Sequence, residues 1–390
     1  MGAGMGSTDA SGKTVNRRAF LVSAGALAAS IGLVACGTAA PTAAPPATQP
    51  PPTSPPKPAP TTAPAAPKPT AAPAAAAAPA STVPPGSKLT AAVVSTSWTV
   101  RAVQLVPAAK GWWKDYGLEV ATPVVGPGNA HMAAFIGGSI DFSININTDL
   151  IARTNQQGEK IYAVAGSSNK INYVLFGASN VKTFDDLKGK TVAIEGPASS
   201  TEYLVRDLAA KHNLEPGKDF QFVTIAGTVQ EREQAVLGGA AAAALGTNSD
   251  WPTLKERGLN WLGDLAEVYP DFQQAVIAAR GEVMDKQPTA SVALLKGLIR
   301  SYQFLLDPAN EQEVLQVLEQ NDVSVDEANF SELLQLQRPL WPADGSLNLK
   351  GLEVVVKREQ DAKRLPDTYD WHQLMRDEPL KQAQKELGLS

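Results

Sequence analysis

Cysteine, histidine and basic charge are all scarce in this chain. Among its 390 residues are one cysteine, Cys36, and three histidines, which excludes an intramolecular disulfide and a thiolate metal cluster. Residues 88–390 carry a formal net charge of −9, which is unfavourable for nucleic-acid binding because phosphate contacts need a basic face. No apolar run in this part approaches the roughly 18 residues of a membrane span. We therefore expect no metal, no cofactor and no nucleic-acid partner.

The first 35 residues have the features of an export signal. Lys13, Arg17 and Arg18 precede the uncharged apolar run 19–35, a pattern typical of a secretory signal peptide. Arg17 and Arg18 lie in a segment that resembles the twin-arginine motif, and the run ends in Leu-Val-Ala-Cys36-Gly, which resembles a bacterial lipobox. This resemblance implies cleavage before Cys36 and lipidation of its thiol. The alternative is that Cys36 is only a small apolar residue of the signal.

Proline and alanine dominate residues 36–87, a segment that we predict to be a disordered tether. Residues 37–87 contain 17 of the chain's 30 prolines, together with 17 alanines. Proline at this density prevents helix and sheet and favours extended polyproline II structure. The segment would let a folded domain work away from a lipid surface, so we expect an extracytoplasmic, lipid-anchored protein. Binding of the proline-rich segment to an SH3-like partner is the alternative.

From residue 88 onward, short apolar runs alternate with helical patterns. This alternation predicts an α/β fold with parallel sheets covered on both faces, followed by a helical tail after residue 282. The predicted strands are 91–95, 118–125, 140–144, 161–165, 173–176, 191–195, 220–225, 241–245 and 274–279, and the predicted helices before the tail are 101–116, 130–136, 149–156, 201–212, 229–237 and 251–257.

Nine strands fit two lobes better than one. We expect lobe 1 to comprise residues 88–180 and 248–390, and lobe 2 to comprise residues 181–247. The chain would then cross between the lobes twice, which makes a hinge with a cleft between the lobes, where small ligands commonly bind.

Three segments resemble one protein family. Residues 110–120 (KGWWKDYGLEV), 134–142 (AFIGGSIDF) and 184–193 (FDDLKGKTVA) are similar, in this order, to motifs of type II periplasmic binding proteins. The subgroup serves ABC importers of nitrate, taurine, alkanesulfonates and thiamine pyrimidines. An aromatic–acid–proline triplet that is usual in this subgroup is replaced here by Thr247-Asn248-Ser249, which leaves the fold expected but the ligand open.

Polar residues that follow the predicted strands are the candidate ligand contacts, because ligands of open α/β sheets bind at the carboxyl ends of strands. For each of them, capping of a helix or packing at a lobe edge is the alternative role. Trp98 in particular could be a flat wall for a ring. The candidates are Ser97, Trp98, Asn129, Asn145, Asn147, Ser199, Ser200, Thr201, Asn248 and Asp250.

The loop that contains Ser199, Ser200 and Thr201 is the expected anion site. Free amides, hydroxyl groups and the positive end of a helix dipole meet where this loop enters a helix. The resemblance supports the same assignment, because this loop commonly holds the acidic group of the ligand in the family.

The function expected from these observations is capture of a small organic anion, such as a sulfonate, a taurine-like compound or a carboxylate, for an ABC permease. We expect a monomer. One alternative is a neutral pyrimidine-like ring as the ligand, and another is an enzyme related to the yeast pyrimidine synthase. We expect that the protein is not an enzyme, because residues 88–390 contain no cysteine, no G-x-S-x-G elbow, no P-loop and no H-E-x-x-H helix. A sensor lobe of a signalling receptor would need an output domain, which the sequence does not contain.

Overall fold

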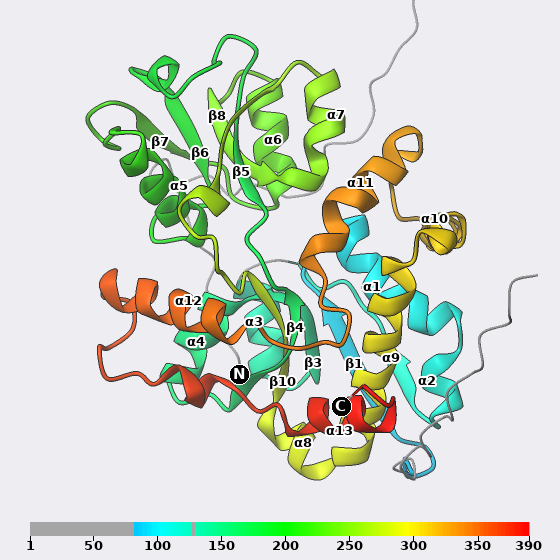
Figure 1. Ribbon diagram of the computed structural model, residues 1–390. Helices are drawn as coiled ribbons and strands as arrows, with labels where there is room; N and C mark the ends of the chain where they lie inside the picture. Colours follow the sequence, from blue (N-terminus) through cyan, green and yellow to red (C-terminus); the bar gives the residue numbers. More distant parts are fainter. Residues whose placement is uncertain (1–81, 127–128, 390) are drawn as a thin grey trace, which may run out of the picture. The chain divides into compact units, whose positions relative to one another are not determined.

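The computed structural model describes residues 82–126 and 129–389. The predicted signal peptide, Cys36 and the predicted tether up to residue 81 lie outside the described residues. The described residues belong to one compact unit, which contains two five-stranded sheets with helices on their faces (Figure 1). The predicted fold class, an α/β protein with a helical C-terminal region, is confirmed.

The first sheet has the strand order β2-β1-β3-β10-β4. Strand β1 pairs in parallel with β2 and β3, whereas β10 is antiparallel to both β3 and β4. Its strands are β1 (Lys88–Val93), β2 (Glu119–Ala121), β3 (Phe142–Asn147), β4 (Ile161–Ser168) and β10 (Ala275–Arg280).

The second sheet repeats this plan, with the order β7-β6-β8-β5-β9. Strand β6 is parallel to β7 and β8, and β5 is antiparallel to β8 and β9. Its strands are β5 (Tyr173–Gly177), β6 (Thr191–Ile194), β7 (Gln221–Thr224), β8 (Ala243–Thr247) and β9 (Asn260–Asp264).

Both sheets are therefore mixed, and the prediction of parallel sheets was wrong in this respect. All nine predicted strands overlap a strand of the structure, but β9 was missed. Its sequence Asn-Trp-Leu-Gly-Asp contains Gly263 and two residue types that are rare in strands. Pairing with β5 makes it an edge strand in spite of this composition.

The sheets also divide the chain differently from the predicted lobes. Strand β5 was placed in lobe 1, yet it lies between β8 and β9 in the second sheet. The strands of that sheet extend from Tyr173 to Asp264, beyond the predicted limits of residues 181 and 247. The turn after Gly177 resembled a linker in the sequence, but long-range antiparallel pairing with β8 draws β5 into the second sheet.

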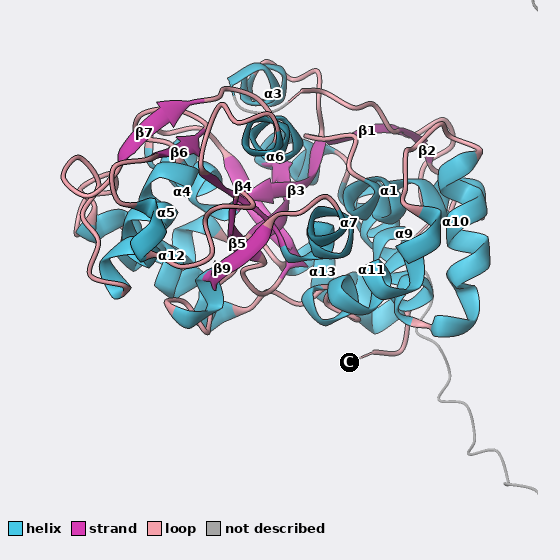
Figure 2. Ribbon diagram, turned by 90° about the horizontal axis from the view of Figure 1, so that it is seen from above, coloured by secondary structure: helices cyan, strands magenta, loops and turns pink. Residues whose placement is uncertain are grey.

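Helices cover both faces of each sheet, and two apolar layers result from the alternation of side chains along the strands. In β1, Ala91 and Val93 face one layer and Ala92 faces the other. In β5, Leu175 and Phe176 divide in the same way. Figure 2 shows helices surrounding the strands. The helices before β10 are α1 (Trp98–Ala109), α2 (Trp112–Asp115), α3 (Asn129–Ile136), α4 (Thr148–Gln156), α5 (Ser200–Lys211), α6 (Val229–Leu237) and α7 (Trp251–Glu256).

The helical C-terminal region packs on the first sheet and its helix α1. Its helices are α8 (Gly281–Lys286), α9 (Pro288–Leu306), α10 (Glu311–Glu319), α11 (Phe330–Gln337), α12 (Leu349–Asp361) and α13 (Glu378–Glu386). Among the residues that the structure describes, no helix is both long and apolar enough to cross a membrane.

The first family-like segment, residues 110–120, supports this packing. The indole Nε1 of Trp113 donates a hydrogen bond to the carbonyl oxygen of Leu294 in α9 at 3.1 Å. Gly297 makes room for the same ring, since a Cβ at this position would lie 2.1 Å from Nε1. This segment therefore has a structural role in joining α2 to α9.

Candidate functional site

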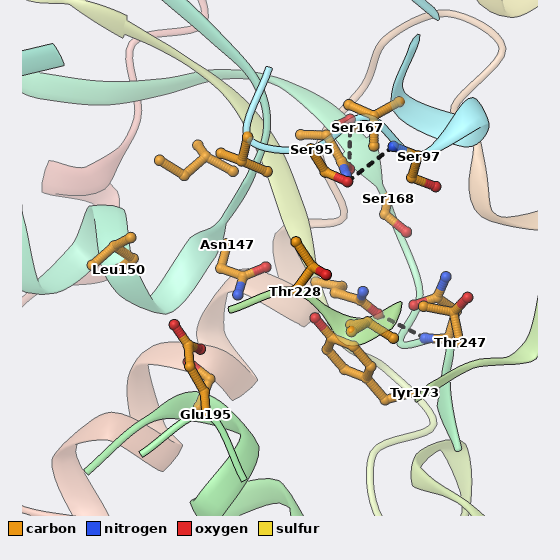
Figure 3. A pocket seen from close by; sticks show the side chains of 18 of the residues that line it. Ser95, Ser97, Asn147, Leu150, Ser167, Ser168, Tyr173, Glu195, Thr228 and Thr247 are labelled. Carbon is orange, nitrogen blue, oxygen red and sulfur yellow. Dashed lines mark hydrogen bonds between the residues drawn. The ribbon is translucent and has the colours of Figure 1, made fainter. Parts of the chain in front are cut away.

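A cavity of about 590 Å³ is lined by residues from both sheets and their helices. Figure 3 shows side chains that point into it from several elements: Ser97 before α1, Asn147 at the end of β3, Tyr173 from β5, and Glu195 after β6. The volume is in the range typical of small-molecule sites. Five of the ten predicted ligand contacts line this cavity: Ser97, Asn145, Asn147, Ser199 and Ser200.

The side of the cavity formed by the first sheet presents amide and hydroxyl groups. Asn145 has a φ of 63°, a left-handed conformation that asparagine tolerates better than most residues. Its Oδ1 accepts a hydrogen bond from the Ser167 hydroxyl at 3.1 Å. Asn147 is the N-cap residue of α4, but its side chain makes no capping hydrogen bond. Its side chain instead acts on the hydroxyl of Tyr173 in the second sheet, whose pKa it lowers.

On the side of the second sheet, the hydroxyl groups of the predicted anion loop already have protein partners. Ser199 Oγ accepts a hydrogen bond from the Glu202 amide at 3.3 Å and thereby caps α5. Thr201, which is buried, accepts one from the Glu195 amide at 2.8 Å. The Ser200 hydroxyl donates to a carboxylate oxygen of Asp149, at the beginning of α4. The three hydroxyl groups at this helix N-terminus are therefore already hydrogen-bonded within the protein.

Four predicted contacts do not line the cavity. The Trp98 side chain is 6% exposed, and its ring packs edge-on against Phe330 and Trp341. Trp98 is the first residue of α1, and its ring turns toward α11 rather than toward a ligand. The four predicted contacts that lie outside the lining are Trp98, Thr201, Asn248 and Asp250.

Asn129 is the first residue of α3, but its side chain lies outside the described part of the structure. Asn248 and Asp250 form a short 3₁₀ helix after β8. The Asp250 carboxylate accepts a hydrogen bond from the Thr247 hydroxyl and thereby stabilises the turn at the end of β8.

The charged residues of the cavity were missed in the sequence. Arg153, Glu195 and Arg232 line it, together with Tyr173. Arg153 and Arg232 lie within helices, where the sequence gives no indication of which charged side chains face a cavity. Arg101 and Lys170, the cations closest to the candidate loops in the sequence, do not line it.

Burial dominates the electrostatics of this region. It raises the pKa of the Tyr173 hydroxyl, an effect that Arg232 opposes and that the carboxylates of Asp149 and Glu195 reinforce. Burial also raises the pKa of Glu233 well above its usual value, and the nearby Asp250 carboxylate acts in the same direction. Both effects favour the neutral form of the Glu233 carboxyl.

These groups suit noncovalent binding of a polar solute. Hydroxyl, amide and phenol groups supply donors and acceptors. Two cationic side chains, Arg153 and Arg232, and the anionic Glu195 supply charge in the lining. Within residues 82–126 and 129–389, no cluster of histidine, cysteine, aspartate and glutamate has the arrangement of a metal site.

The sequence matches the model of the NMT1/THI5-like family over residues 98–311, which is more than half of the chain. The chain belongs to this family.

Two curated relatives come from Synechococcus elongatus. The bicarbonate-binding protein CmpA is 25% identical over 126 residues, which cover 31% of this chain and 27% of CmpA. The bicarbonate transport ATP-binding protein CmpC is 29% identical over 133 residues, which cover 34% of this chain and 20% of CmpC. The matched part of the chain thus spans only a fifth to about a quarter of these relatives.

Solved structures of binding proteins share the fold. The periplasmic nitrate-binding protein NrtA from Synechocystis PCC 6803 has a TM-score of 0.61 and 15% identity, with 78% of this chain and 90% of NrtA covered. The alkanesulfonate-binding protein SsuA from Xanthomonas axonopodis pv. citri, bound to MOPS, has a TM-score of 0.60 and 13% identity, with 75% and 99% covered. At these identities the similarity establishes the fold alone.

Proposed function

We propose that this protein is the extracytoplasmic solute-binding component of an ABC importer and captures a small organic anion, such as a sulfonate or a carboxylate. The observation that carries this proposal is the cavity, to which both sheets contribute polar residues. A site shared by two sheets allows the two halves to close around a solute and to present a different surface to a permease.

The names of similar proteins support the import of an anion. Nitrate, alkanesulfonate and bicarbonate appear in the names of proteins that share the fold or part of the sequence. All three are small oxyanions or carry one. The neutral pyrimidine-like ligand is less well supported, because Trp98, the expected wall for a ring, packs against Phe330 and Trp341.

The remaining parts of the proposal concern the placement of the protein. Lipidation of Cys36 would anchor the mature chain at the outer side of the cytoplasmic membrane, and residues 37–87 would serve as its tether. The two crossings between the sheets, at residues 169–172 and 265–274, would form the hinge. We propose that the protein binds its solute as a monomer and delivers it to a cognate permease.

Thermal unfolding with a panel of solutes tests the proposal. The protein for this experiment is Cys36–Ser390 with the substitution Cys36→Ser, which retains all residues that the structure describes. The panel contains nitrate, bicarbonate, alkanesulfonates, aminosulfonates, carboxylates, amino acids and pyrimidines. A ligand at 100 times its Kd adds about 2.7 kcal/mol of stability, which raises the Tm by several degrees.

A shift limited to one class of anion would support the binding role and identify the ligand class. Shifts with pyrimidines alone would favour the neutral ligand. If no solute shifts the Tm, capture of a small solute from these classes is contradicted.

A further inference from the structure

Arg232 places a positive charge in the cavity wall, and no carboxylate among the described residues forms an ion pair with it. The residue lies in α6 and is 3% exposed. Its Nη1 donates a hydrogen bond to the Gly227 carbonyl oxygen at 3.0 Å, and its buried Nε has no partner. Within the described parts of the chain, it makes no ion pair. A buried charge in this situation is costly unless a counter-charge arrives.

The acidic residue next to Arg232 in the sequence does not balance this charge. Glu233 is buried and makes no ion pair with Arg232 among the described residues, and burial and the nearby Asp250 raise its pKa, which favours its neutral form. Arg232 therefore remains available to an acidic group that enters the cavity. The hydrogen bond from Nη1 to Gly227 holds the guanidinium group in place, and its unpartnered Nε–H can donate to a planar or tetrahedral oxyanion.

Glu195 supplies the opposite charge on the cavity wall. It follows β6, is partly exposed, and its carboxylate makes no ion pair or hydrogen bond with any residue that the structure describes. In Figure 3 its side chain points into the cavity, toward Asn147. This carboxylate would repel an anionic ligand that carries no positive group.

The third charged group in the lining is already neutralised. Arg153 Nη2 lies 3.1 Å from Asp149 Oδ2, and its Nε lies 3.7 Å from Glu359 Oε2. Arg232 and Glu195 are therefore the lining charges, among the described residues, that a ligand can use. Both line the same cavity as Tyr173, so one ligand can meet both charges there.

We propose that the cavity selects a zwitterion, whose acid group binds Arg232 and whose protonated amine binds Glu195, over a plain anion of the same size. This inference rests on the proposed binding function and specifies its ligand class. In this proposal the acid group of the ligand binds at α6 and not at the Ser199–Thr201 loop, because the hydroxyl groups of that loop already have protein partners.

Isothermal titration calorimetry on Cys36–Ser390 carrying Cys36→Ser tests this proposal with matched pairs of ligands. The pairs are β-alanine and propionate, 4-aminobutyrate and butyrate, taurine and ethanesulfonate, and 3-aminopropanesulfonate and propanesulfonate. In the best pair, the amine-bearing ligand should bind at least tenfold more tightly than its partner.

Glu195→Gln is the decisive variant because it changes the charge with almost no change in shape. It should weaken the zwitterion at least tenfold and leave the plain anion equally or more tightly bound. Arg232→Lys keeps a positive charge but loses the guanidinium geometry, and it should weaken both ligands of a pair. Glu215→Gln, which removes an exposed carboxylate of the second lobe, should change neither affinity. Thermal unfolding verifies that each variant is folded.

Three results would overturn the inference. If plain anions bind as tightly as their amine-bearing partners, or if Glu195→Gln weakens both ligands equally, the selection of zwitterions is refuted while anion capture stands. If no ligand of any pair binds and no other solute of the panel shifts the Tm, the proposed function fails together with the inference.

Discussion

The hydroxyl of Ser200 donates a hydrogen bond to the carboxylate of Asp149. This bond joins the first turn of α5, which packs on the second sheet, to the first turn of α4, which packs on the first sheet. Each residue lies at a helix N-terminus, where a carboxylate is also favoured by the helix dipole. The predicted anion loop thus contributes to the contact between the two halves of the protein.

Replacement of Ser200 should test this contact. Ser200→Ala removes a hydrogen bond to a charged group, and we expect the free energy of unfolding to fall by about 1.5 kcal/mol. Ser200→Thr keeps the hydroxyl and serves as the matched control. Urea unfolding measures both variants, and equal stability of Ser200→Ala and the unsubstituted protein would contradict the assigned contact.

The buried carboxyl of Glu233 predicts a pH-dependent stability. Its pKa is raised in the folded state, so the unfolded chain releases this proton first as the pH rises above about 4.3, the ordinary glutamate value. The folded state then binds more protons than the unfolded state, and its stability falls with rising pH. Glu233→Gln should remove this pH-dependent loss of stability, and its amide keeps a hydrogen-bond donor at the position.

The stability advantage of Glu233→Gln should therefore be small at pH 4 and increase toward pH 7. Each unit of pKa shift that is removed contributes about 1.4 kcal/mol. Denaturant unfolding at a series of pH values measures it, with Glu353→Gln, an exposed position, as the control. An advantage that does not change with pH would show that Glu233 is not protonated in the folded protein.

The ion pair between Lys296 and Glu386 is buried and should be sensitive to the loss of one partner. Its N–O distance is 2.9 Å, and the two side chains are 6% and 1% exposed. Lys296→Met removes the cation that lies beside this buried carboxylate and should cost about 3–5 kcal/mol. The double variant Lys296→Met/Glu386→Gln removes the charge as well and should recover most of this loss. Equal stability of the single and double variants would contradict the role of the charge.

Gly297 should tolerate no side chain. A methyl group at this position would overlap the indole of Trp113, so Gly297→Ala should destabilise the protein by about 1–3 kcal/mol in spite of the better helix propensity of alanine. The control is Lys255→Ala, which introduces an alanine at an exposed position of helix α7. The exposed Gly258 is unsuitable as a control because its φ of 85° would strain an alanine. Thermal unfolding measures both, and a Gly297→Ala variant with an unchanged Tm would refute the close contact.

The sequence alone determined the fold class and the positions of most elements. Apolar runs and helical periodicity are local properties, so nine of the strands and the helices around them could be located without the structure. The three family-like segments also lie in single stretches of sequence. Ser97, Asn145 and Asn147 were found as cavity residues because the polar ends of parallel strands meet at one edge of a sheet.

Only the tertiary structure decided which strands share a sheet and which charges share the cavity. Strand β5 joins the second sheet through hydrogen bonds to β8, about 70 residues later in the chain, and no local pattern encodes such a partner. The direction of a side chain from a helix depends on what the helix packs against. Trp98 therefore turns toward Phe330, whereas Arg232, inside α6, faces the cavity.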